Sequence, residues 1–509
     1  MKLKDILPLN NEKFYGDGET EISGVSYDSR KVKKGFLFFA LPGHQTDGKK
    51  YIRDAIANGA VVIVSDAYDK DIKVAQIESG DVFGFMSLFC AKFFNYPDRE
   101  LTILGITGTN GKTTVTYMIE SILANLGVSC GVIGTVNYRY GGKVIEASNT
   151  TPQSLDVYKM MREMSDGGVK HLAMEVSSHA LSLGRVGGID FDTAVFTNLT
   201  QDHLDFHKTM ENYFQAKASL FKSLGVGKKN NTKFAIINVD DDYGIRLSKM
   251  SLNAEIKSYS AAAENKSDFH AENIFISASG SKFDALYNGQ TQNISIKHIG
   301  LHNVHNALAS LAAVVCLGYS FDKTAAALSA STQAPGRLER VDTKNLGFEV
   351  AVDYAHTEDA LKNVLAAIKN LNPQRIITVF GAGGDRDRTK RPLMGKTATE
   401  MSDFVFVTSD NPRTEDPEKI ILDIEVGIKK AGKKNYKVVV DREQAIKEAV
   451  VMAEKGDVVL IAGKGHETYQ IIGTQKTHFN DAEIALKYII VKEKQRLQAR
   501  QLGQKEFGF

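Results

Sequence analysis

The residues with the clearest chemical potential lie between Leu101 and Thr114, in the stretch LTILGITGTNGKTT. The apolar run at 101–106 predicts a buried strand, glycines then mark a turn, and Lys112 opens a segment expected to be helical through Leu123. A loop of this kind turns backbone N–H groups toward an anion, and the helix N-terminus adds positive potential. We therefore predict a nucleoside triphosphate site here.

In such a loop the lysine reaches the β- and γ-phosphates, and the hydroxyl that follows it ligates Mg²⁺. The strict pattern has a glycine five residues before Gly111, where this chain has Ile106, so TGTNGKT is a variant. The alternative is a glycine-rich turn with a chance lysine, which leaves the strand, the helix and the paired hydroxyls unexplained. The residues expected to contact ATP in this loop are Gly108, Thr109, Asn110, Gly111, Lys112, Thr113 and Thr114.

Two further polar clusters follow strand-like runs in the same region. Glu175 ends the run LAME, and Asp202, His203 and Asp205 lie within four residues of one another in NLTQDHLD. A single Glu or His at a strand end is more often structural, but two such clusters beside a phosphate loop favour metal binding and phosphate handling. Lys217, by contrast, reads by composition as a surface lysine.

Polar clusters also end successive strands in the last third of the chain. They are DYAH at 353–356, GAGGDRDR at 381–388, DNPR at 410–413 and GKGHE at 463–467. Within them, Arg386 and Arg413 offer planar donors suited to a carboxylate. Arginines for a carboxylate beside an ATP site suggest activation of one carboxylate and its joining to an amine.

The elements that must position these residues form an α/β protein of three domains. Strands alternate with helical segments from 98 to 332, which predicts a mostly parallel sheet with ligands at the carboxyl ends of its strands. Turns at 95–98 and 333–337 break the pattern. The predicted domains are 1–97, 98–332 and 333–509, the last being a second α/β unit.

Composition narrows the class of protein. Of 509 residues, 43% are apolar and 24% charged, and a net charge of +2 gives no nucleic-acid footprint. Cys90, Cys130 and Cys316 lie far apart, as expected for small buried hydrophobic residues in a reducing compartment. The N-terminus lacks a signal-peptide h-region, and no run approaches the roughly 18 apolar residues of a membrane span. A soluble cytoplasmic protein is expected.

Taken together, the motifs resemble those of the Mur ligase family of bacterial peptidoglycan synthesis. The resemblance covers nearly the whole chain. Its markers are TGTNGKTT (107–114), NTTP (149–152), MEVSSHAL (174–181), FTNLTQDHLDFH (196–207), HNVHNALA (302–309), PGRLE (335–339), DYAHTEDAL (353–361), GGDRDRTKRPLMG (383–395), DNPR (410–413) and GKGHE (463–467).

The resemblance implies an N-terminal UDP-binding domain, a central ATPase domain and a C-terminal dinucleotide-fold-like domain for an incoming amino acid. It implies ATP and Mg²⁺, with the γ-phosphate passing to a substrate carboxylate to give an acyl phosphate that an amine attacks. The implied substrates are UDP-N-acetylmuramoyl-L-alanyl-D-glutamate and meso-diaminopimelate. A monomer without nucleic-acid or membrane partners is expected.

Site residues also carry over from the resemblance, motif by motif. Lys112, Glu175, His203 and Lys217 are the expected catalytic residues, and the lysine at 217 matches one that the family carbamylates. Leu183 stands where the family often has Gln. The expected ligands of magnesium are Thr113, Glu175, His203 and carbamylated Lys217. The UDP-substrate residues are Ser29, His44, Gln45, Thr46, Asn149, Thr150, Thr151, Ser177 and Arg185, and ATP is also met by Asn303, Arg337 and Asp353. The diaminopimelate residues are Arg386, Asp410, Asn411, Pro412, Arg413, Gly463 and Glu467.

The choice of amino acid depends on DNPR. Diaminopimelate carries a second carboxylate, which Arg413 can hold bidentately, whereas lysine has none. Lysine would leave Arg413 buried without its partner, at a cost of roughly 2–5 kcal/mol. Diaminopimelate is therefore expected.

Two alternatives remain at this stage. A related ligase that adds glutamate to folates shares the phosphate loop, but VSYDSR, GHQTDG and DNPR favour the muramoyl branch. A phosphate-loop switch or motor would hydrolyse ATP without an amino acid, and leaves the arginine-bearing third domain unexplained.

Overall fold

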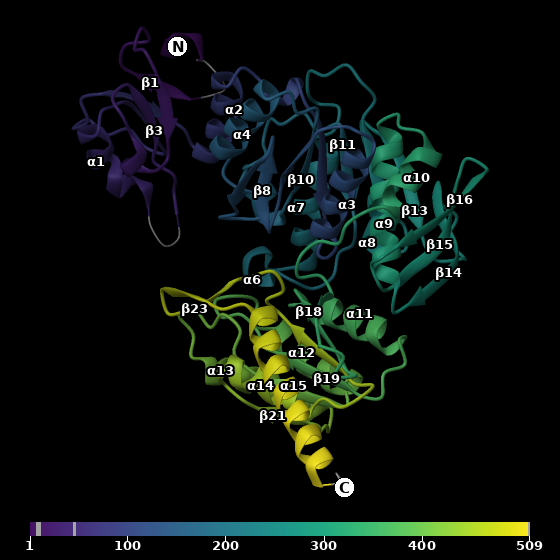
Figure 1. Ribbon diagram of the computed structural model, residues 1–509. Helices are drawn as coiled ribbons and strands as arrows, with labels where there is room; N and C mark the ends of the chain where they lie inside the picture. The colour runs from purple at the N-terminus through teal and green to yellow at the C-terminus, as the bar shows by residue number, and fades with distance from the viewer. Residues whose placement is uncertain (7–11, 44–46, 507–509) are drawn as a thin grey trace.

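The computed structural model describes residues 1–6, 12–43 and 47–506, arranged around three sheets (Figure 1). The N-terminal unit lies against the side of the central unit near helices α2 (Val82–Phe93) and α4 (Ser154–Asp166), and the C-terminal unit lies below. This arrangement confirms the predicted α/β class with three domains. The boundaries at 97/98 and 332/333 stay predictions.

The N-terminal sheet has the order β1-β5-β4-β3-β2 in the part of the chain that is described, and only β1 runs antiparallel to its neighbour. A largely buried strand, β4, follows helix α1 (Ile52–Ala57). The strands are β1 (Lys13–Tyr15), β2 (Gly24–Ser26), β3 (Phe36–Phe39), β4 (Ala60–Ser65) and β5 (Ala75–Glu78).

The central sheet has the order β16-β15-β14-β13-β12-β11-β6-β10-β7-β8-β9. The strands from β14 to β7 in this order are parallel, and antiparallel hairpins extend both edges. The strands are β6 (Thr102–Thr107), β7 (Cys130–Ile133), β8 (Asn137–Tyr140), β9 (Lys143–Glu146), β10 (His171–Glu175), β11 (Thr193–Phe196), β12 (Phe234–Asn238), β13 (Glu255–Ser260), β14 (Phe269–Ser277), β15 (Gly280–Tyr287) and β16 (Gln290–Ile296).

Strand β6 lies between β10 and β11, so the order of the strands reverses there. In open α/β sheets such a switch point opens a crevice beyond the carboxyl ends of the strands, and ligands bind in it. The phosphate loop follows β6 directly and leads into α3 (Lys112–Asn125), as predicted. The sheet therefore places this loop at its natural ligand site.

Helices cover both faces of the central sheet. One apolar core joins α3 to α9 (Leu301–Cys316) and α10 (Phe321–Ser329), and another joins α4 and α7 (Met210–Lys222) to α2. The short helices α5 (Ser178–Ser182), α6 (Leu204–His207) and α8 (Asp242–Ser248) follow strands of this sheet. Figure 1 shows α6 between the central and C-terminal units.

The C-terminal sheet has the order β17-β18-β22-β19-β20-β21, parallel except for β17. The strands expected to end at the polar clusters 353–356, 381–388, 410–413 and 463–467 are all present. The strands are β17 (Glu339–Val341), β18 (Glu349–Asp353), β19 (Ile376–Phe380), β20 (Phe404–Val407), β21 (Tyr436–Val438) and β22 (Val458–Ala462).

Helices α11 (Glu358–Lys369), α12 (Lys390–Met401) and α13 (Pro417–Lys430) cover one face of this sheet. The other face is covered by α14 (Arg442–Met452) and α15 (Asp481–Glu506). A separate hairpin, β23 (Tyr469–Ile472) and β24 (Gln475–His478), follows β22.

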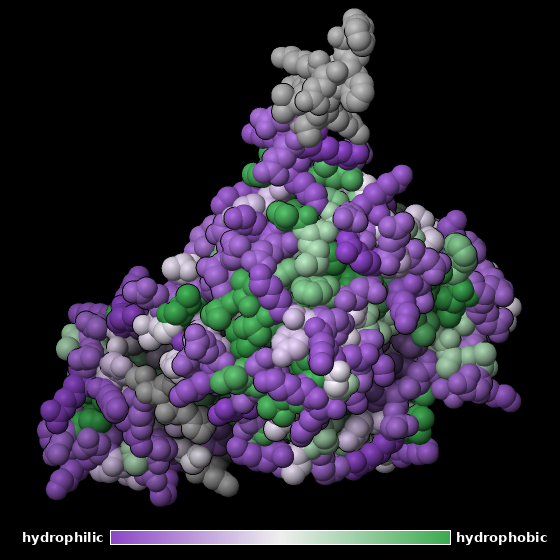
Figure 2. All heavy atoms as spheres, turned by 90° about the horizontal axis from the view of Figure 1, so that it is seen from below, coloured by the Kyte–Doolittle hydropathy of each residue, from purple (hydrophilic) through white to green (hydrophobic). Residues whose placement is uncertain are grey.

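Surface and burial correct one expectation. Cys90 is buried, but Cys130 and Cys316 are only partly buried, so the three cysteines are not uniformly core residues. Viewed from below, the surface is mostly hydrophilic, with a broken band of hydrophobic residues (Figure 2). In the described part of the chain, no helix is long and apolar enough to cross a membrane.

Candidate functional site

Two glycines fix the path of the phosphate loop. Gly108 has φ +148°, and a Cβ there would lie 1.8 Å from Thr197 Oγ1. Gly111 has φ +89°, and a Cβ there would lie 2.4 Å from Asn306 Oδ1. Both positions thus need glycine for conformation and for space. Asn198 holds the loop in place, since its carbonyl and side-chain oxygens accept hydrogen bonds from the next two backbone N–H groups of the loop, both at 2.9 Å.

Two lysines converge on the carbonyl of Gly108. Lys112 Nζ donates to this oxygen at 2.9 Å and to Thr109 O at 2.8 Å, and Lys217 Nζ donates to Gly108 O at 2.8 Å. Burial lowers the pKa of Lys112. The amines of Lys112 and Lys217 therefore both lie at the loop where phosphates are expected to bind.

Lys217 corrects the expectation of a surface lysine. Its side chain is only 1% exposed, and Nζ lies 4.6 Å from the centroid of the Tyr213 ring. Burial, with the charge of Lys112 as a second cause, lowers the pKa of Lys217 well below its ordinary value. The position is therefore a buried amine beside the loop, which composition alone does not reveal.

Oxygen donors meet at the start of α3. Thr113 Oγ1 donates to Glu175 Oε2 at 3.0 Å and accepts from Arg337 Nη2 at 3.1 Å. Thr135 donates to both oxygens of Glu175, from its backbone N at 2.9 Å and its hydroxyl at 3.0 Å. The carboxylate of Glu175 is thus held rigidly against the hydroxyl that follows the loop lysine.

This pair of oxygens fits Mg²⁺, which prefers oxygen ligands, keeps several waters and takes phosphate oxygens in nucleotide sites. Among the described residues, no group of three His, Cys, Asp or Glu side chains could hold a metal ion alone. The protein therefore offers Thr113 and Glu175, with His203 on the same cavity wall. The remaining ligands are those that a nucleotide and water supply.

The cluster Asp202, His203 and Asp205 is only partly brought together. His203 has φ +56°, and its Nε2 lies 3.5 Å from Asp202 Oδ2. Asp202 is buried and paired with Lys390, whereas Asp205 is exposed on α6. The expectation that all three act together on a metal is wrong for Asp205. It is an exposed residue of the helix and lines neither cavity described below.

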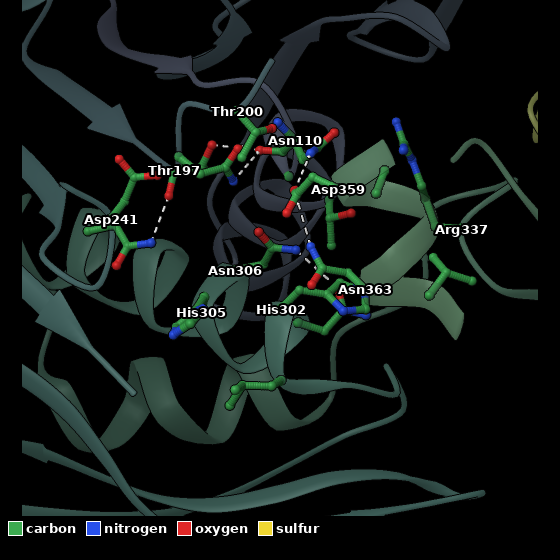
Figure 3. Close-up of a pocket in the computed structure, with 18 of the residues that line it drawn as sticks. Asn110, Thr197, Thr200, Asp241, His302, His305, Asn306, Arg337, Asp359 and Asn363 are labelled. Carbon is green, nitrogen blue, oxygen red and sulfur yellow. Dashed lines mark hydrogen bonds between the residues drawn. The ribbon is translucent and has the colours of Figure 1, made fainter. Parts of the chain in front are cut away.

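A first cavity of about 350 Å³ opens between the central and C-terminal units (Figure 3). Helix α9 contributes Asn303 and Asn306, and the C-terminal unit contributes Arg337, Asp353 and Asp359. The three residues predicted to meet ATP from outside the loop all line it. The cavity begins at the phosphate loop, with Asn110, Gly111 and Thr114 in its lining, so it lies where the nucleoside part of ATP is expected.

The phosphate loop contacts the C-terminal unit in this cavity. Asn110 Nδ2 donates to Asp359 Oδ2 at 2.8 Å, a contact visible in Figure 3. Asp353 Oδ2 accepts from the N–H of Leu338 at 2.7 Å. Burial raises the pKa of Asp353 despite the nearby charge of Arg337. The nucleotide end of the site is therefore built by two units at once.

A second cavity of about 350 Å³ continues on the other side of the loop. Its lining includes residues predicted to bind ATP, residues predicted to bind the muramoyl dipeptide and residues predicted to bind the amino acid. Those that line it are Thr109, Asn110, Gly111, Lys112, Thr113, Asn149, Thr150, Glu175, Ser177, His203, Arg337, Arg386, Asp410, Asn411, Arg413, Gly463 and Glu467. Phosphate loop, muramoyl residues and amino-acid residues thus share one space.

Several predicted residues line neither cavity. Thr151 is buried and donates to the carbonyl of Glu175 at 2.7 Å, while Arg185 Nη1 donates to the carbonyl of Thr151 at 3.0 Å, so both support the wall. Pro412 lies beside the cavity residues in sequence but not in its lining, and Ser29 is buried in the N-terminal unit. The predicted residues His44, Gln45 and Thr46 lie outside the described residues.

At the amino-acid end, two arginines face the cavity. Arg413 is half-buried, has φ +52°, and donates from Nη1 to the carbonyl of Gly384 at 2.7 Å. Arg386 is exposed at the mouth of the cavity. Below them, Lys464 is fully buried and donates to Asn411 Oδ1 at 3.2 Å and to Glu467 Oε2 at 3.0 Å. The guanidiniums retain free donors for an anion.

Sequence reasoning missed Thr135, Lys390 and Lys464 as parts of this site. Lys390 lies inside GGDRDRTKRPLMG and Lys464 inside GKGHE, so the motifs held them without assigning a role. No local signal distinguishes Thr135, which is placed by the turn after β7. Thr135, Lys390 and Lys464 each have a partner far away in the sequence, namely Glu175, Asp202 and Asn411.

A phosphate loop at the switch point of a parallel sheet, sharing a cavity with the arginines of a second α/β unit, defines an ATP-dependent enzyme of group transfer. Family models agree with this class. The Mur ligase middle domain matches residues 106–314, the Mur ligase glutamate ligase domain matches 336–465, and the Mur ligase family catalytic domain matches 21–82. The chain belongs to the Mur ligase family.

Similar proteins span nearly the full chain. UDP-N-acetylmuramoyl-L-alanyl-D-glutamate–2,6-diaminopimelate ligase 1 of Clostridium acetobutylicum is 45% identical over 494 residues, covering 96% of this chain and 99% of the relative. The ligase of the same name from Solibacter usitatus is 46% identical over 470 residues, covering 92% and 93%.

Solved structures agree. One named for the same ligase has a TM-score of 0.67 at 32% identity, covering 97% of this chain and 99% of that one. The MurF ligase of Thermotoga maritima, solved with ADP, has a TM-score of 0.64 at 17% identity, covering 94% of this chain and 99% of that one. The latter likeness concerns the fold alone.

Proposed function

We propose that this chain is an ATP-dependent ligase that joins meso-diaminopimelate to UDP-N-acetylmuramoyl-L-alanyl-D-glutamate. One observation supports this most strongly: the phosphate loop and the paired arginines Arg386 and Arg413 line the same cavity. A carboxylate activated at the loop is then within the same space as the amine of an amino acid whose distal carboxylate is held by the arginines. The names of the relatives point to the same substrates.

The reaction begins with phosphoryl transfer. A carboxylate oxygen of the muramoyl dipeptide attacks the γ-phosphorus of ATP, the bond to ADP breaks, and an acyl phosphate forms. Bound Mg²⁺ supplies neutralisation of phosphate charge beside Thr113, Glu175 and His203. Lys112 and the backbone N–H groups of the loop hold the phosphates, so catalysis is largely positioning and charge stabilisation.

Amide formation follows at the same carbonyl. The amine nitrogen of diaminopimelate attacks the acyl carbon, a tetrahedral intermediate forms, and inorganic phosphate leaves with the bonding electrons while the amine gives up a proton. Arg413 and Arg386 hold the distal carboxylate, with Asp410, Asn411 and Glu467 around the distal amine. A carboxylate is inert toward amines until one of its oxygens becomes a leaving group, which explains the order of the two steps.

Lys217 has a separate proposed role. A lysine that is neutral because it is buried can form an N–C bond with CO₂ and release a proton to water, which leaves an anionic carbamate that would suit magnesium. The contact of Lys217 Nζ with Gly108 O supports a position next to the phosphates. In this proposal the residue changes from a cation to an anion at the loop.

The remaining assignments complete the proposal. The N-terminal unit, residues 1–97 with Ser29, His44, Gln45 and Thr46, receives the UDP end of the substrate. Asn149, Thr150, Thr151, Ser177 and Arg185 hold the muramoyl dipeptide, and Leu183 replaces a frequent Gln. The units 98–332 and 333–509 bind ATP and the amino acid. The enzyme acts in the cytoplasm as a monomer, without nucleic-acid or membrane partners.

The test measures phosphate release and product mass with ATP, Mg²⁺ and the UDP-linked dipeptide. Meso-diaminopimelate and L-lysine are added in separate reactions, and a third contains neither. We expect turnover and a tripeptide product with diaminopimelate only. Equal turnover with lysine would overturn the specificity, and phosphate release that needs no amino acid would favour a switch or motor.

A further inference from the structure

A buried ion pair joins the central and C-terminal units at the wall of the second cavity. Lys390 Nζ, on the first residue of α12, lies 3.0 Å from Asp202 Oδ1, in the loop after β11. The side chains are 7% and 4% exposed. Lys390 therefore has its partner in the central unit, whereas Asp202 Oδ1 also accepts the N–H of His203 at 2.9 Å from its own unit.

The surrounding contacts also cross between the units. Gln201 Nε2 donates to Thr389 Oγ1 at 2.8 Å, and the N–H of Leu204 donates to Asp387 Oδ2 at 3.3 Å. His356 Nε2, again from the C-terminal unit, lies 3.7 Å from the other oxygen of Asp202. The loop after β11 and the start of α12 therefore form one docked interface around the ion pair.

The two segments in this interface also carry groups of the reaction. His203 follows Asp202 directly, and Arg386 lies four residues before Lys390 in the sequence. Any shift of α12 relative to the loop would move the amino-acid end of the cavity relative to the phosphate end. Small misplacements of reacting groups are costly to the rate because the amine and the acyl carbon must meet in an attack geometry.

We propose that Asp202 and Lys390 are positioning residues that hold the C-terminal unit in register over the phosphate loop, so that the amine reaches the acyl phosphate before water does. The inference rests on the ligase function proposed above. A buried ion pair gains little net stability over apolar residues, but a single unpaired charge in its place is strongly unfavourable. The pair therefore favours the one docked arrangement in which both charges are matched.

The test uses Asp202→Asn and Lys390→Met, singly and together, in the full-length enzyme. Each reaction is followed for both inorganic phosphate and tripeptide, because an acyl phosphate that is not met by an amine is lost to water. In the parent enzyme the two products appear in equal amounts. We expect either single variant to lower the tripeptide rate about 10-fold or more and to release phosphate in excess of tripeptide.

The double variant distinguishes a role in positioning the C-terminal unit from a direct role of either side chain in the reaction. Because it leaves no unpaired charge at the interface, it is expected to make tripeptide faster than either single variant and to show less excess phosphate. A double variant that is impaired by the product of the two single effects would overturn the proposal. So would single variants that keep phosphate and tripeptide equal, since a purely structural defect lowers both together.

Two further variants serve as controls for folding. Lys233→Met breaks the pairs of Lys233 with Asp190, at 2.9 Å, and with Asp192, at 3.2 Å, which have similar burial but lie wholly within the central unit. It is expected to lower the thermal unfolding temperature without producing excess phosphate. Gln201→Ala removes only the exposed contact to Thr389, so it should fold normally and show a small excess.

The outcome also distinguishes this inference from the proposed function. If the parent enzyme makes no tripeptide with diaminopimelate, the ligase assignment fails. If the parent makes tripeptide and Lys233→Met produces as much excess phosphate as Lys390→Met, the ligase assignment stands and the positioning role fails.

Discussion

The amine of Lys217 shows how packing determines the chemistry of a single residue. An exposed lysine is a cation, but burial against Gly108 and the Tyr213 ring favours the neutral amine, with a pKa well below the ordinary value. The neutral form is the nucleophile that CO₂ requires. If this face of α7 were exposed to solvent, the lysine would remain an ordinary ammonium group and would not react with CO₂.

Replacing Lys217 by Ala is expected to lower ligase activity at least about 100-fold, because a ligand of the phosphate region is lost. Added acetate should restore part of the activity by filling the space with a carboxylate. Labelled bicarbonate should give a carbamate carbon signal in the parent protein by NMR. Lys222→Ala, on the same helix but exposed, should change neither measurement. Full activity without acetate in the Lys217 variant would remove the residue from the mechanism.

Arg413→Ala is expected to raise the KM for diaminopimelate about 30-fold or more while changing the KM for ATP little, because only the distal carboxylate loses its partner. Steady-state kinetics with each substrate varied in turn measures the two effects. Arg388→Ala is the matched control, since Arg388 is an exposed arginine paired with Asp423. Equal rises in both KM values would show that Arg413 is structural.

At the scale of elements, one buried arginine ties together the loops that present Arg386 and Arg413. Arg391, fully buried at the start of α12, donates to both oxygens of Glu415 and to the carbonyl of Gly383 at 3.1 Å. Glu415 also accepts the N–H of Asp385 at 2.6 Å. The guanidinium fork therefore sets the separation of two loops that follow different strands.

Arg391→Lys keeps the charge but removes the fork, since an ammonium cannot bridge the carboxylate and the carbonyl in one plane. We expect the KM for diaminopimelate to rise about 10-fold, with a smaller change for ATP, and the unfolding temperature to fall by several degrees. Kinetics and thermal unfolding check the two effects. An unfolding change alone, with KM intact, would mean that the loops hold their spacing without Arg391.

The sequence predicts best those elements whose signal is local. The strand predicted at 101–106 is a short apolar run bounded by polar turns, and its position is confirmed to within one residue. The edge hairpins, such as β8–β9, were not predicted, because β9 is exposed along its whole length and lacks an apolar face. Local pattern also cannot pair Asp202 with Lys390, which are 188 residues apart.

The same contrast between local signals and long-range packing decides which residues of the functional site could be predicted. Motifs identified the loop and the arginines because their chemistry is carried by residue type and spacing. The burial of Lys217 and the pairing of Lys390 depend on how helices dock, which is a property of the folded chain. Asp205 was wrongly grouped with the metal-binding residues, because its closeness in sequence to His203 does not bring its side chain into the cavity.

For the whole molecule, one buried histidine and two half-buried histidines predict sensitivity to acid. Burial lowers the pKa of His298 and His302 to about 4 each, and of His466 to about 3. Folded pKa values below the unfolded value mean that the unfolded chain binds more protons between about pH 6.5 and pH 4. The stability these neutral histidines support is present above that range and is lost as the pH falls through it.

We expect the free energy of unfolding to drop by up to about 1.4 kcal/mol per pH unit for each such histidine below pH 6.5. Urea unfolding at several pH values measures the slope. His298→Asn should flatten it, because both ring nitrogens of His298 are buried without a hydrogen-bond partner. His478→Asn, at an exposed position, is the control and should leave the slope unchanged. Equal slopes in all three proteins would contradict the assignment.

The last helix has a consequence for how the protein is made. Asp481, the first residue of α15, forms a fully buried pair with Arg442, at 2.7 Å, and Arg442 Nη2 also donates to the carbonyl of Ala462 at 3.0 Å. Ala462 immediately precedes Gly463 and the segment that leads to Glu467. A chain still growing on the ribosome therefore completes its phosphate loop hundreds of residues before the floor of its amino-acid pocket. An unfinished copy lacks both the C-terminal wall of the nucleotide cavity and the support of the amino-acid pocket, so the complete site exists only when synthesis is nearly over.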